Sequence, residues 1–215
     1  MVKALKLILA SSSPRRVKLL RNLGFNPVVI QPKGVKEVLE GSAREIVKRN
    51  AVAKLRAVLD GVRAVTEGIG GKVVVVAADT IAVTREERVL GKPSSVEEAR
   101  EYLKALRCGW HSVLTGVAVA LIEGGLLRDE VVDVVETRVK MRCFSDEELE
   151  AYLRSGEPLG KAGAYALQGL GALLVERVDG DPYNVVGLPL ARVNELVMDV
   201  AGVSLLEEVT RAGEG

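Results

Sequence analysis

The sequence predicts an α/β protein in which helices flank a mixed central sheet and two lobes enclose a cleft. In the first half of the chain, apolar strand patterns alternate with helical patterns, which favours strands joined by helices. In the second half, long β-branched stretches meet at a glycine turn, which is typical of an antiparallel hairpin. No repeat or linker interrupts the sequence. We therefore expect one domain over residues 1–215, with a frayed tail at about 206–215.

The first predicted strand and helix meet at a polar junction. An apolar run at residues 5–10 leads into residues 11–16, which read Ser-Ser-Ser-Pro-Arg-Arg, and a helical pattern then continues to Gly24. Pro14 suits a first helical turn, where its missing N–H group costs nothing. Free backbone N–H groups, hydroxyls and two guanidinium groups would then share one small volume, which is typical of a phosphate site. An ordinary capped helix with surface arginines would produce the same pattern.

The following elements are predicted from periodicity and from capping signals. A strand is expected at residues 27–32. Serine with glutamate three residues later is a capping box, a signature of helix starts. The capping boxes are Ser42 with Glu45, Ser95 with Glu98 and Ser145 with Glu148. The remaining elements are strands at residues 111–122, 126–141 and 173–178, a turn at residues 180–184 and a closing helix from residue 190 to about 200.

Charged side chains stand beside apolar segments at three places. The uninterrupted apolar strand at residues 72–78 suits burial on both faces, and it ends at Asp79. A carboxylate there is costly unless it is paired, caps a helix or holds a cation. Lys54 lies close to the apolar stripe of the long helix, and Lys92 follows a predicted hairpin at residues 81–90. Both lysines could instead be ordinary surface cations.

Composition excludes several classes of function. Lys and Arg total 30 against 29 Asp and Glu, and aromatic residues are only 3%, so no nucleic-acid partner is expected. A single histidine, His111, excludes a histidine-rich metal cluster, and we expect it to be structural. Cys108 and Cys143 lack the spacing of a zinc ribbon or a CxxC pair, which leaves their state open. With no export or anchor signal, a cytoplasmic protein without a membrane partner is expected.

A set of short motifs lies in a fixed order along the chain. They are Leu9-Ala10-Ser11-Ser12-Ser13-Pro14-Arg15-Arg16, Ala78-Asp79-Thr80, Gly91-Lys92-Pro93, His111 with Thr115-Gly116, Ser155-Gly156-Glu157-Pro158, Lys161-Ala162-Gly163-Ala164-Tyr165, Gln168-Gly169 and Val185-Val186-Gly187-Leu188-Pro189. Over residues 5–200 the sequence resembles the Maf family, the septum-formation-inhibitor-like nucleoside triphosphate pyrophosphatases. The resemblance implies a fold like that of the Maf and inosine-triphosphatase proteins, with a nucleotide-binding cleft. It also implies metal-dependent hydrolysis between the α and β phosphates.

The resemblance implies a role for individual residues. The implied catalytic residues are Asp79, Glu37, Lys54 and Lys92. The implied substrate-binding residues are Ser11, Ser13, Arg15, Arg16, Thr80 and Gln168. Of these, Arg15, Thr80 and Gln168 match the positions that vary with substrate, and they resemble the branch acting on dTTP and UTP rather than on methylated GTP. Arg15 would select the base, and Arg16 would hold phosphate.

The implied chemistry needs charge neutralisation and a positioned water, because a triphosphate carries about four negative charges. Glu37 and Asp79 offer the oxygen ligands that Mg²⁺ or Mn²⁺ takes, so both are the expected metal ligands. Asp79 would accept the proton of the attacking water, although it could instead act only as a ligand.

Alternatives remain open within this interpretation. The same chemistry could act on CTP or on modified nucleotides. The alternative outside the enzymes is a non-catalytic nucleotide-binding regulator of cell division. As an enzyme, the protein would limit non-standard nucleotides or cell division. The resemblance also suggests a homodimer.

Overall fold

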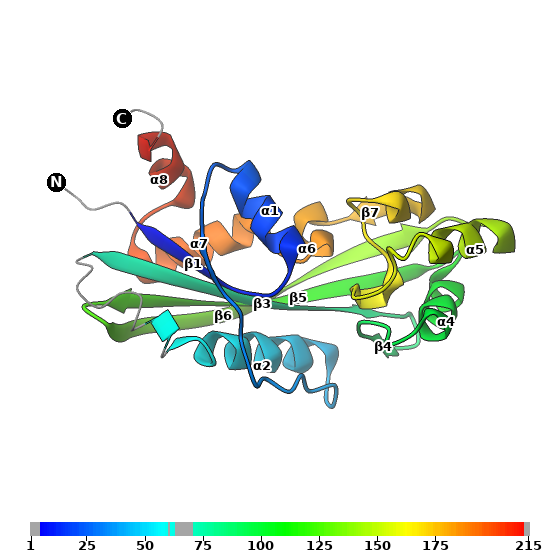
Figure 1. The fold of residues 1–215 in the computed structure, drawn as a ribbon, viewed down its shortest axis with the longest axis horizontal. Coiled ribbons are helices and arrows are strands. Elements are labelled where there is room, and N and C mark those ends of the chain that lie inside the picture. Colours follow the sequence, from blue (N-terminus) through cyan, green and yellow to red (C-terminus); the bar gives the residue numbers. More distant parts are fainter. Residues whose placement is uncertain (1–4, 60, 63–70, 213–215) are drawn as a thin grey trace.

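One mixed sheet of seven strands runs along the molecule and carries helices on both faces (Figure 1). The computed structural model describes residues 5–59, 61–62 and 71–212. The strands are β1 (Lys6–Ala10), β2 (Val28–Ile30), β3 (Lys72–Val83), β4 (Val89–Leu90), β5 (Trp110–Glu123), β6 (Leu126–Met141) and β7 (Val175–Asp179). The helices are α1 (Pro14–Asn22), α2 (Ala43–Arg56), α4 (Val96–Leu106), α5 (Asp146–Arg154), α6 (Pro182–Val186), α7 (Leu190–Ala201) and α8 (Leu205–Ala212), with 3₁₀ helices η1 (Ala162–Ala164) and η2 (Leu170–Leu174).

The predicted mixed α/β architecture is confirmed. The strand order is β2-β1-β3-β5-β6-β7, with β4 paired to β3. Strands β2, β1 and β3 are parallel, and the other pairs are antiparallel. The parallel part is the strand–helix half of the sequence, and the antiparallel part contains the predicted hairpin of β5 and β6.

Strand β3 is longer than predicted. The expected strand at residues 72–78 and the first strand of the expected hairpin at 81–90 are one continuous element, Lys72–Val83, which pairs with β5 along its whole length. Asp79 therefore lies inside the strand, opposite Gly116, and not at its end. An interior strand position rules out the helix-capping alternative for Asp79, so its buried carboxylate must be stabilised by other groups.

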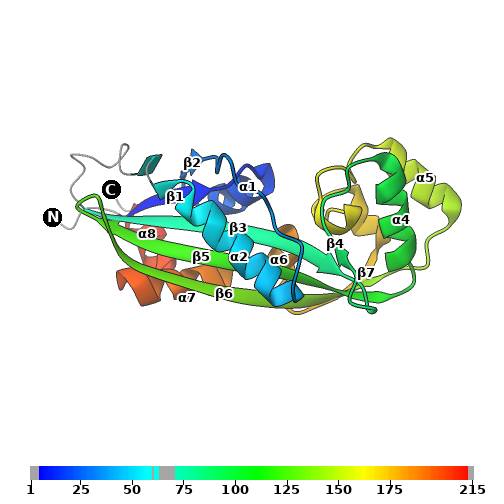
Figure 2. The same ribbon diagram turned by 90° about the horizontal axis from the view of Figure 1, so that it is seen from below.

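Several hydrophobic clusters form the core of the described residues, and they lie in a larger and a smaller lobe. In the larger lobe, α2 covers one face of the sheet, whereas α1 and α7 cover the other (Figure 1, Figure 2). Strand β1 serves both faces, since Leu7 and Leu9 pack beneath α1 and α7 while Ile8 and Ala10 pack beneath α2. In the smaller lobe, α4 and α5 enclose a separate core around the far ends of β3, β5 and β6.

The capping boxes at Ser42 and Ser145 are confirmed, and the helices begin one residue after each serine. The box at Ser95 is only half formed. Ser95 accepts a hydrogen bond from the backbone N–H of Glu98, but the Glu98 carboxylate accepts from Ser94 instead. Among the described residues, no helix has both the length and the apolar character needed to cross a membrane.

Two predictions near the C-terminus are wrong. The expected turn at residues 180–184 contains the start of α6, which Asp181 caps by accepting from the N–H of Tyr183. The residues expected to fray from about 206 form α8, so α7 is not the closing helix. Helix α8 is held because Leu205 is buried and Glu208 accepts a hydrogen bond from the backbone N–H of Leu5. The last residues of that tail, 213–215, lie outside the described residues.

Cys108 and Cys143 form a disulfide. It joins the segment before β5 to the segment between β6 and α5. The two residues are 35 positions apart, and the pairing of β5 with β6 brings them together. Sequence spacing could not identify the bond, because the contact depends on the register of that hairpin.

Candidate active site

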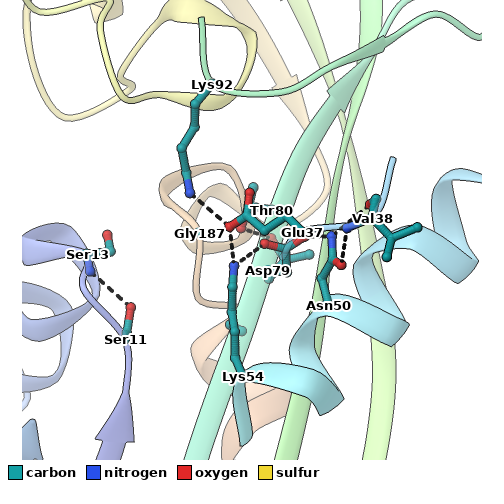
Figure 3. A network of polar contacts seen from close by, with 12 residues as sticks. Ser11, Ser13, Glu37, Val38, Asn50, Lys54, Asp79, Thr80, Lys92 and Gly187 are labelled. Atoms are coloured by element: carbon teal, nitrogen blue, oxygen red, sulfur yellow. Dashed lines mark hydrogen bonds and ion pairs between the residues drawn. The ribbon is translucent and has the colours of Figure 1, made fainter. Parts of the chain in front are cut away.

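The Ser-Ser-Ser-Pro-Arg-Arg segment forms the junction that its sequence predicts. It connects β1 to α1, with Pro14 in the first turn and Ser13 at the N-cap position. The Ser13 side chain does not cap the helix, whereas its backbone N–H donates to Ser11 Oγ at 3.1 Å (Figure 3). The first turn of α1 therefore has no side-chain cap, and its residues line the cavity together with Ser13, as an anion site requires.

Arg16 is buried and binds protein groups with all three of its nitrogens. Its Nε donates to the carbonyl of Gly187 at 2.6 Å, its Nη1 to the carbonyl of Ala78 at 2.9 Å, and its Nη2 to Thr80 Oγ1 at 2.9 Å. Burial lowers the pKa of Arg16 to about 10, so it stays charged at neutral pH. Arg16 ties the junction to β3 and to the segment after α6, and it presents its charge to the cavity from within this network.

A lysine bridges two carboxylates on the floor of the cavity. Lys54 Nζ donates to Glu37 Oε1 at 2.7 Å and makes a short hydrogen bond to Asp79 Oδ1 (Figure 3). Lys92 Nζ donates to the same Glu37 oxygen at 3.1 Å. Asp79 and Lys54 are buried, whereas Lys92 reaches in from an exposed position between the lobes. Two lysines and two carboxylates thus form one ion-pair network.

Asn50 completes this network, and sequence reasoning assigned it no role. Its Nδ2 donates to Asp79 Oδ2 at 3.0 Å and to the carbonyl of Val38 at 3.0 Å, while its Oδ1 accepts from the N–H of Val38 at 2.9 Å. Asn50 and Lys54 stand one turn apart on α2, so both point at Asp79. That spacing of four residues was the signal that could have identified Asn50.

The network sets the charge state of Glu37. Partial burial favours the protonated acid, but hydrogen bonds and charges from Lys54 and Lys92 outweigh burial and hold the pKa of Glu37 below its usual value. Glu37 is therefore an anion at neutral pH. Because Lys54 and Lys92 together balance the charges of Glu37 and Asp79, the site offers cationic groups to a substrate without an uncompensated negative charge.

The donor set fits a divalent cation that substrate oxygens complete. Glu37 and Asp79 supply carboxylate oxygens, and Mg²⁺ commonly takes one or two protein carboxylates together with phosphate oxygens and waters. No group of three His, Cys, Asp or Glu side chains with metal-binding geometry occurs within residues 5–59, 61–62 and 71–212. A closed metal cage made of protein ligands is therefore not a feature of the part of the chain that the structure describes.

Every predicted site residue lines one cavity of about 300 Å³ between the lobes. These residues are Ser11, Ser13, Arg15, Arg16, Glu37, Lys54, Asp79, Thr80, Lys92 and Gln168. Its volume is at the lower end of the range for small-molecule sites. Arg15 and Gln168 lie toward the smaller lobe, and burial lowers the pKa of Arg15 from its ordinary value while leaving it a cation.

Thr80, which lines the cavity, and His111 also bind protein groups. Thr80 Oγ1 lies 2.9 Å from Thr115 Oγ1, in addition to accepting from Arg16. His111 is buried, with Nε2 2.9 Å from the hydroxyl of Tyr165, which lines the cavity. Burial lowers the pKa of His111 to about 4, so the ring is neutral at pH 7 and supports Tyr165.

Comparison with known proteins assigns the family. The model of the Maf family, described as Maf-like protein, matches residues 6–200. A dTTP/UTP pyrophosphatase from Dictyoglomus thermophilum is 44% identical over 205 residues, which cover 94% of this chain and 98% of that protein. A dTTP/UTP pyrophosphatase from Staphylothermus marinus is 45% identical over 205 residues, covering 95% of this chain and 94% of that protein.

Among solved structures, the Staphylococcus aureus Ham1 protein aligns over 64% of this chain and 72% of that chain, at 14% identity and a TM-score of 0.38. The motif order over residues 6–200 and the relatives of matching length lead to one assignment: this chain belongs to the Maf-like protein family.

Proposed function

We propose that this protein hydrolyses dTTP and UTP between the α and β phosphates, giving the monophosphate and pyrophosphate, with Mg²⁺ or Mn²⁺ as cofactor. The observation that carries the proposal is the bridge of Lys54 between Glu37 and Asp79, which lies in the same cavity as the serine-rich junction. The relatives named dTTP/UTP pyrophosphatase support this choice of reaction and substrate.

The cationic groups of the cavity suit a triphosphate. Lys54 and Lys92 approach from the carboxylate side, and Arg15 and Arg16 approach from the start of α1. The first turn of α1 adds N–H groups and the positive end of the helix dipole. Charge neutralisation and positioning supply most of the catalysis in phosphoryl transfer, so these groups address the main barrier.

Asp79 is the group that accepts the proton of the attacking water. Its two oxygens are held by different residues, since Lys54 donates to Oδ1 and Asn50 donates to Oδ2. This fixes the plane of the carboxylate, as a general base requires. Glu37 and Asp79 would hold the divalent cation, which supplies charge neutralisation and lowers the pKa of water.

In this proposal, the nucleobase of the substrate lies between Arg15 and Gln168, at the end of the cavity away from Asp79. An amide offers one acceptor and two donors, which matches the edge of a pyrimidine. The Gln168 amide is exposed at this edge and makes no hydrogen bond within the described part of the chain. It is therefore available to a ligand.

A panel of nucleoside triphosphates with Mg²⁺, with Mn²⁺ and with excess chelator tests the proposal. We expect pyrophosphate release to be fastest with dTTP and UTP, and to stop when the metal is removed. In ¹⁸O-labelled water, the label should enter the monophosphate, because attack at the α phosphorus breaks the α–β bond.

The alternatives give different outcomes in this panel. Faster turnover of CTP or of a modified nucleotide would move the proposal to another base while keeping the chemistry. Tight nucleotide binding without any release of pyrophosphate would favour a non-catalytic regulator. The intact ion-pair network of Lys54, Glu37 and Asp79 argues against that third outcome, because binding alone does not need an oriented carboxylate.

A further inference from the structure

Glu157, in the Ser155-Gly156-Glu157-Pro158 motif, has no role in the proposed chemistry, yet its carboxylate is fully engaged. Its Oε1 accepts from the backbone N–H of Gly171 at 2.9 Å and from the hydroxyl of Tyr152 at 2.9 Å. Its Oε2 accepts from the backbone N–H of Leu170 at 3.0 Å. Hydrogen bonds to a charged acceptor are the stronger kind, so this carboxylate anchors the start of η2.

The same anchor reaches the other side of Gln168. The Tyr152 hydroxyl, which donates to Glu157, accepts from the backbone N–H of Ala166 at 3.3 Å. The chain is thus held two residues before Gln168 and again two and three residues after it. Between these points the loop exposes Gln168 to the cavity, whereas Glu157 does not line the cavity.

Close packing leaves the loop little freedom around this anchor. A Cβ atom on Gly169 would lie 2.1 Å from Glu157 Oε2, so a side chain there would push the carboxylate off its donors. A Cβ atom on Gly171 would lie 2.7 Å from the backbone oxygen of Ala166 and 2.8 Å from the Tyr152 hydroxyl. Glycine at both positions lets the loop close around the pair of Tyr152 and Glu157.

We propose that Glu157 is a positioning residue that, through Tyr152 and the loop at residues 166–171, holds Gln168 against the base of the bound nucleotide. This inference rests on the proposed function. It assigns to Glu157 a part in substrate selection without contact with the substrate. Loss of the anchor lets the loop relax, which weakens binding of the nucleobase but leaves in place the network of Asp79 and Lys54, whose hydrogen bonds do not involve Glu157.

Steady-state kinetics with dTTP and UTP test this assignment in Glu157→Ala and Glu157→Gln. We expect KM to rise about tenfold for Glu157→Ala, with kcat within about threefold of wild type. Glu157→Gln keeps the volume and one acceptor, so it should show a smaller rise of about threefold. If Glu157→Ala does not fold, the same measurements on Glu157→Gln test the assignment. Glu150→Gln is the matched control, because Glu150 lies on α5 and pairs with Arg100 away from the cavity.

A double-mutant cycle with Gln168→Ala separates positioning from a general structural role. If Glu157 acts through Gln168, its removal from the Gln168→Ala enzyme should change KM by less than about twofold. The inference is overturned if the full effect persists in that background, if kcat falls in place of the rise in KM, or if Glu157→Ala behaves like wild type.

Amide hydrogen exchange at Leu170 and Gly171 gives a readout that does not depend on activity. Exchange should accelerate in Glu157→Ala and stay at the wild-type rate in Glu150→Gln. Unchanged exchange in Glu157→Ala would overturn the inference. If the wild-type protein releases no pyrophosphate, the proposed function fails, and this measurement alone decides whether Glu157 positions the loop.

Discussion

Asn50→Ala should damage both stability and catalysis, because one buried amide connects the two carboxylate segments of the site. Asn50 is only 1% exposed and makes three hydrogen bonds, to Asp79 Oδ2 and to both backbone groups of Val38, the neighbour of Glu37. A bond to a charged acceptor contributes about 1.5–3 kcal/mol and a neutral one about 1 kcal/mol, although such terms are not additive. Alanine leaves these groups unpaired, so we expect a loss of about 2–4 kcal/mol of unfolding free energy.

The expected loss of activity in Asn50→Ala follows from the orientation of the Asp79 carboxylate. Without Asn50, Asp79 Oδ2 loses its donor, while Oδ1 keeps the hydrogen bond from Lys54. The backbone of Val38 loses both of its hydrogen bonds to α2, so Lys54 alone of these two α2 side chains still holds the segment, through Glu37. Loss of such a supporting contact costs about 10–100-fold, so kcat for dTTP should fall by that factor while KM changes little. Urea unfolding followed by circular dichroism and a coupled pyrophosphate assay measure the two effects.

Asn194→Ala is the matched control for this prediction. Asn194 Oδ1 accepts from the N–H of Leu205 at 2.7 Å and from Ser204 Oγ at 3.1 Å. These hydrogen bonds anchor the start of α8, and none of the three residues lines the cavity. This variant should lose stability and keep kcat. If Asn50→Ala is destabilised but retains kcat within about twofold of wild type, the argument that Asn50 orients Asp79 is refuted.

Three other perturbations have defined outcomes. Burial holds the pKa of His111 at about 4, below its ordinary 6.5, so the unfolded chain binds the proton first. Stability should then fall by up to about 3 kcal/mol between about pH 6.5 and pH 4, and His111→Gln should remove that slope in denaturant unfolding; an unchanged slope would assign it to other groups. In Gly116→Ala, the new Cβ would lie 2.2 Å from the backbone oxygen of Val47, so α2 must move and unfolding free energy should fall by about 3 kcal/mol or more, with lost activity; a stable, active variant would contradict this packing. Arg16→Lys cannot reproduce contacts with Gly187, Ala78 and Thr80, and should lower the melting temperature by more than Arg21→Lys, an α1 control on the exposed face; equal melting temperatures would refute it.

The helices and strands could be predicted from the sequence wherever capping residues and hydrophobic periodicity match the burial seen in the structure. The helix starts at Ser42 and Ser145 and the hairpin of β5 and β6 were predictable because caps and periodicity are short-range signals. The continuation of β3 through Asp79 was not, because a carboxylate ends an apolar run in the sequence. The groups that make its burial tolerable, Lys54 and Asn50, come from a helix distant in sequence.

The family resemblance implied the site residues that line the cavity, but the hydrogen-bond partners of each side chain could not be predicted from the sequence. Nothing in two adjacent arginines indicates that Arg16 turns into the protein while Arg15 stays toward the smaller lobe. The order of α8 depends on Glu208 reaching β1. Such contacts form only when elements distant in sequence pack together, so they can be identified only in the three-dimensional structure.

Pyrophosphate release from UTP by the wild-type protein and by Asp79→Asn, with Mg²⁺ present and nucleotide binding measured in parallel, tests the central claim most directly. Asparagine keeps the shape of the side chain but cannot accept the proton of water. We predict that the wild-type protein turns over and that the variant loses at least about 10³-fold in kcat while binding UTP within a few-fold of wild type. Equal turnover by the two proteins, or no release from UTP or dTTP by the wild type, would contradict the account.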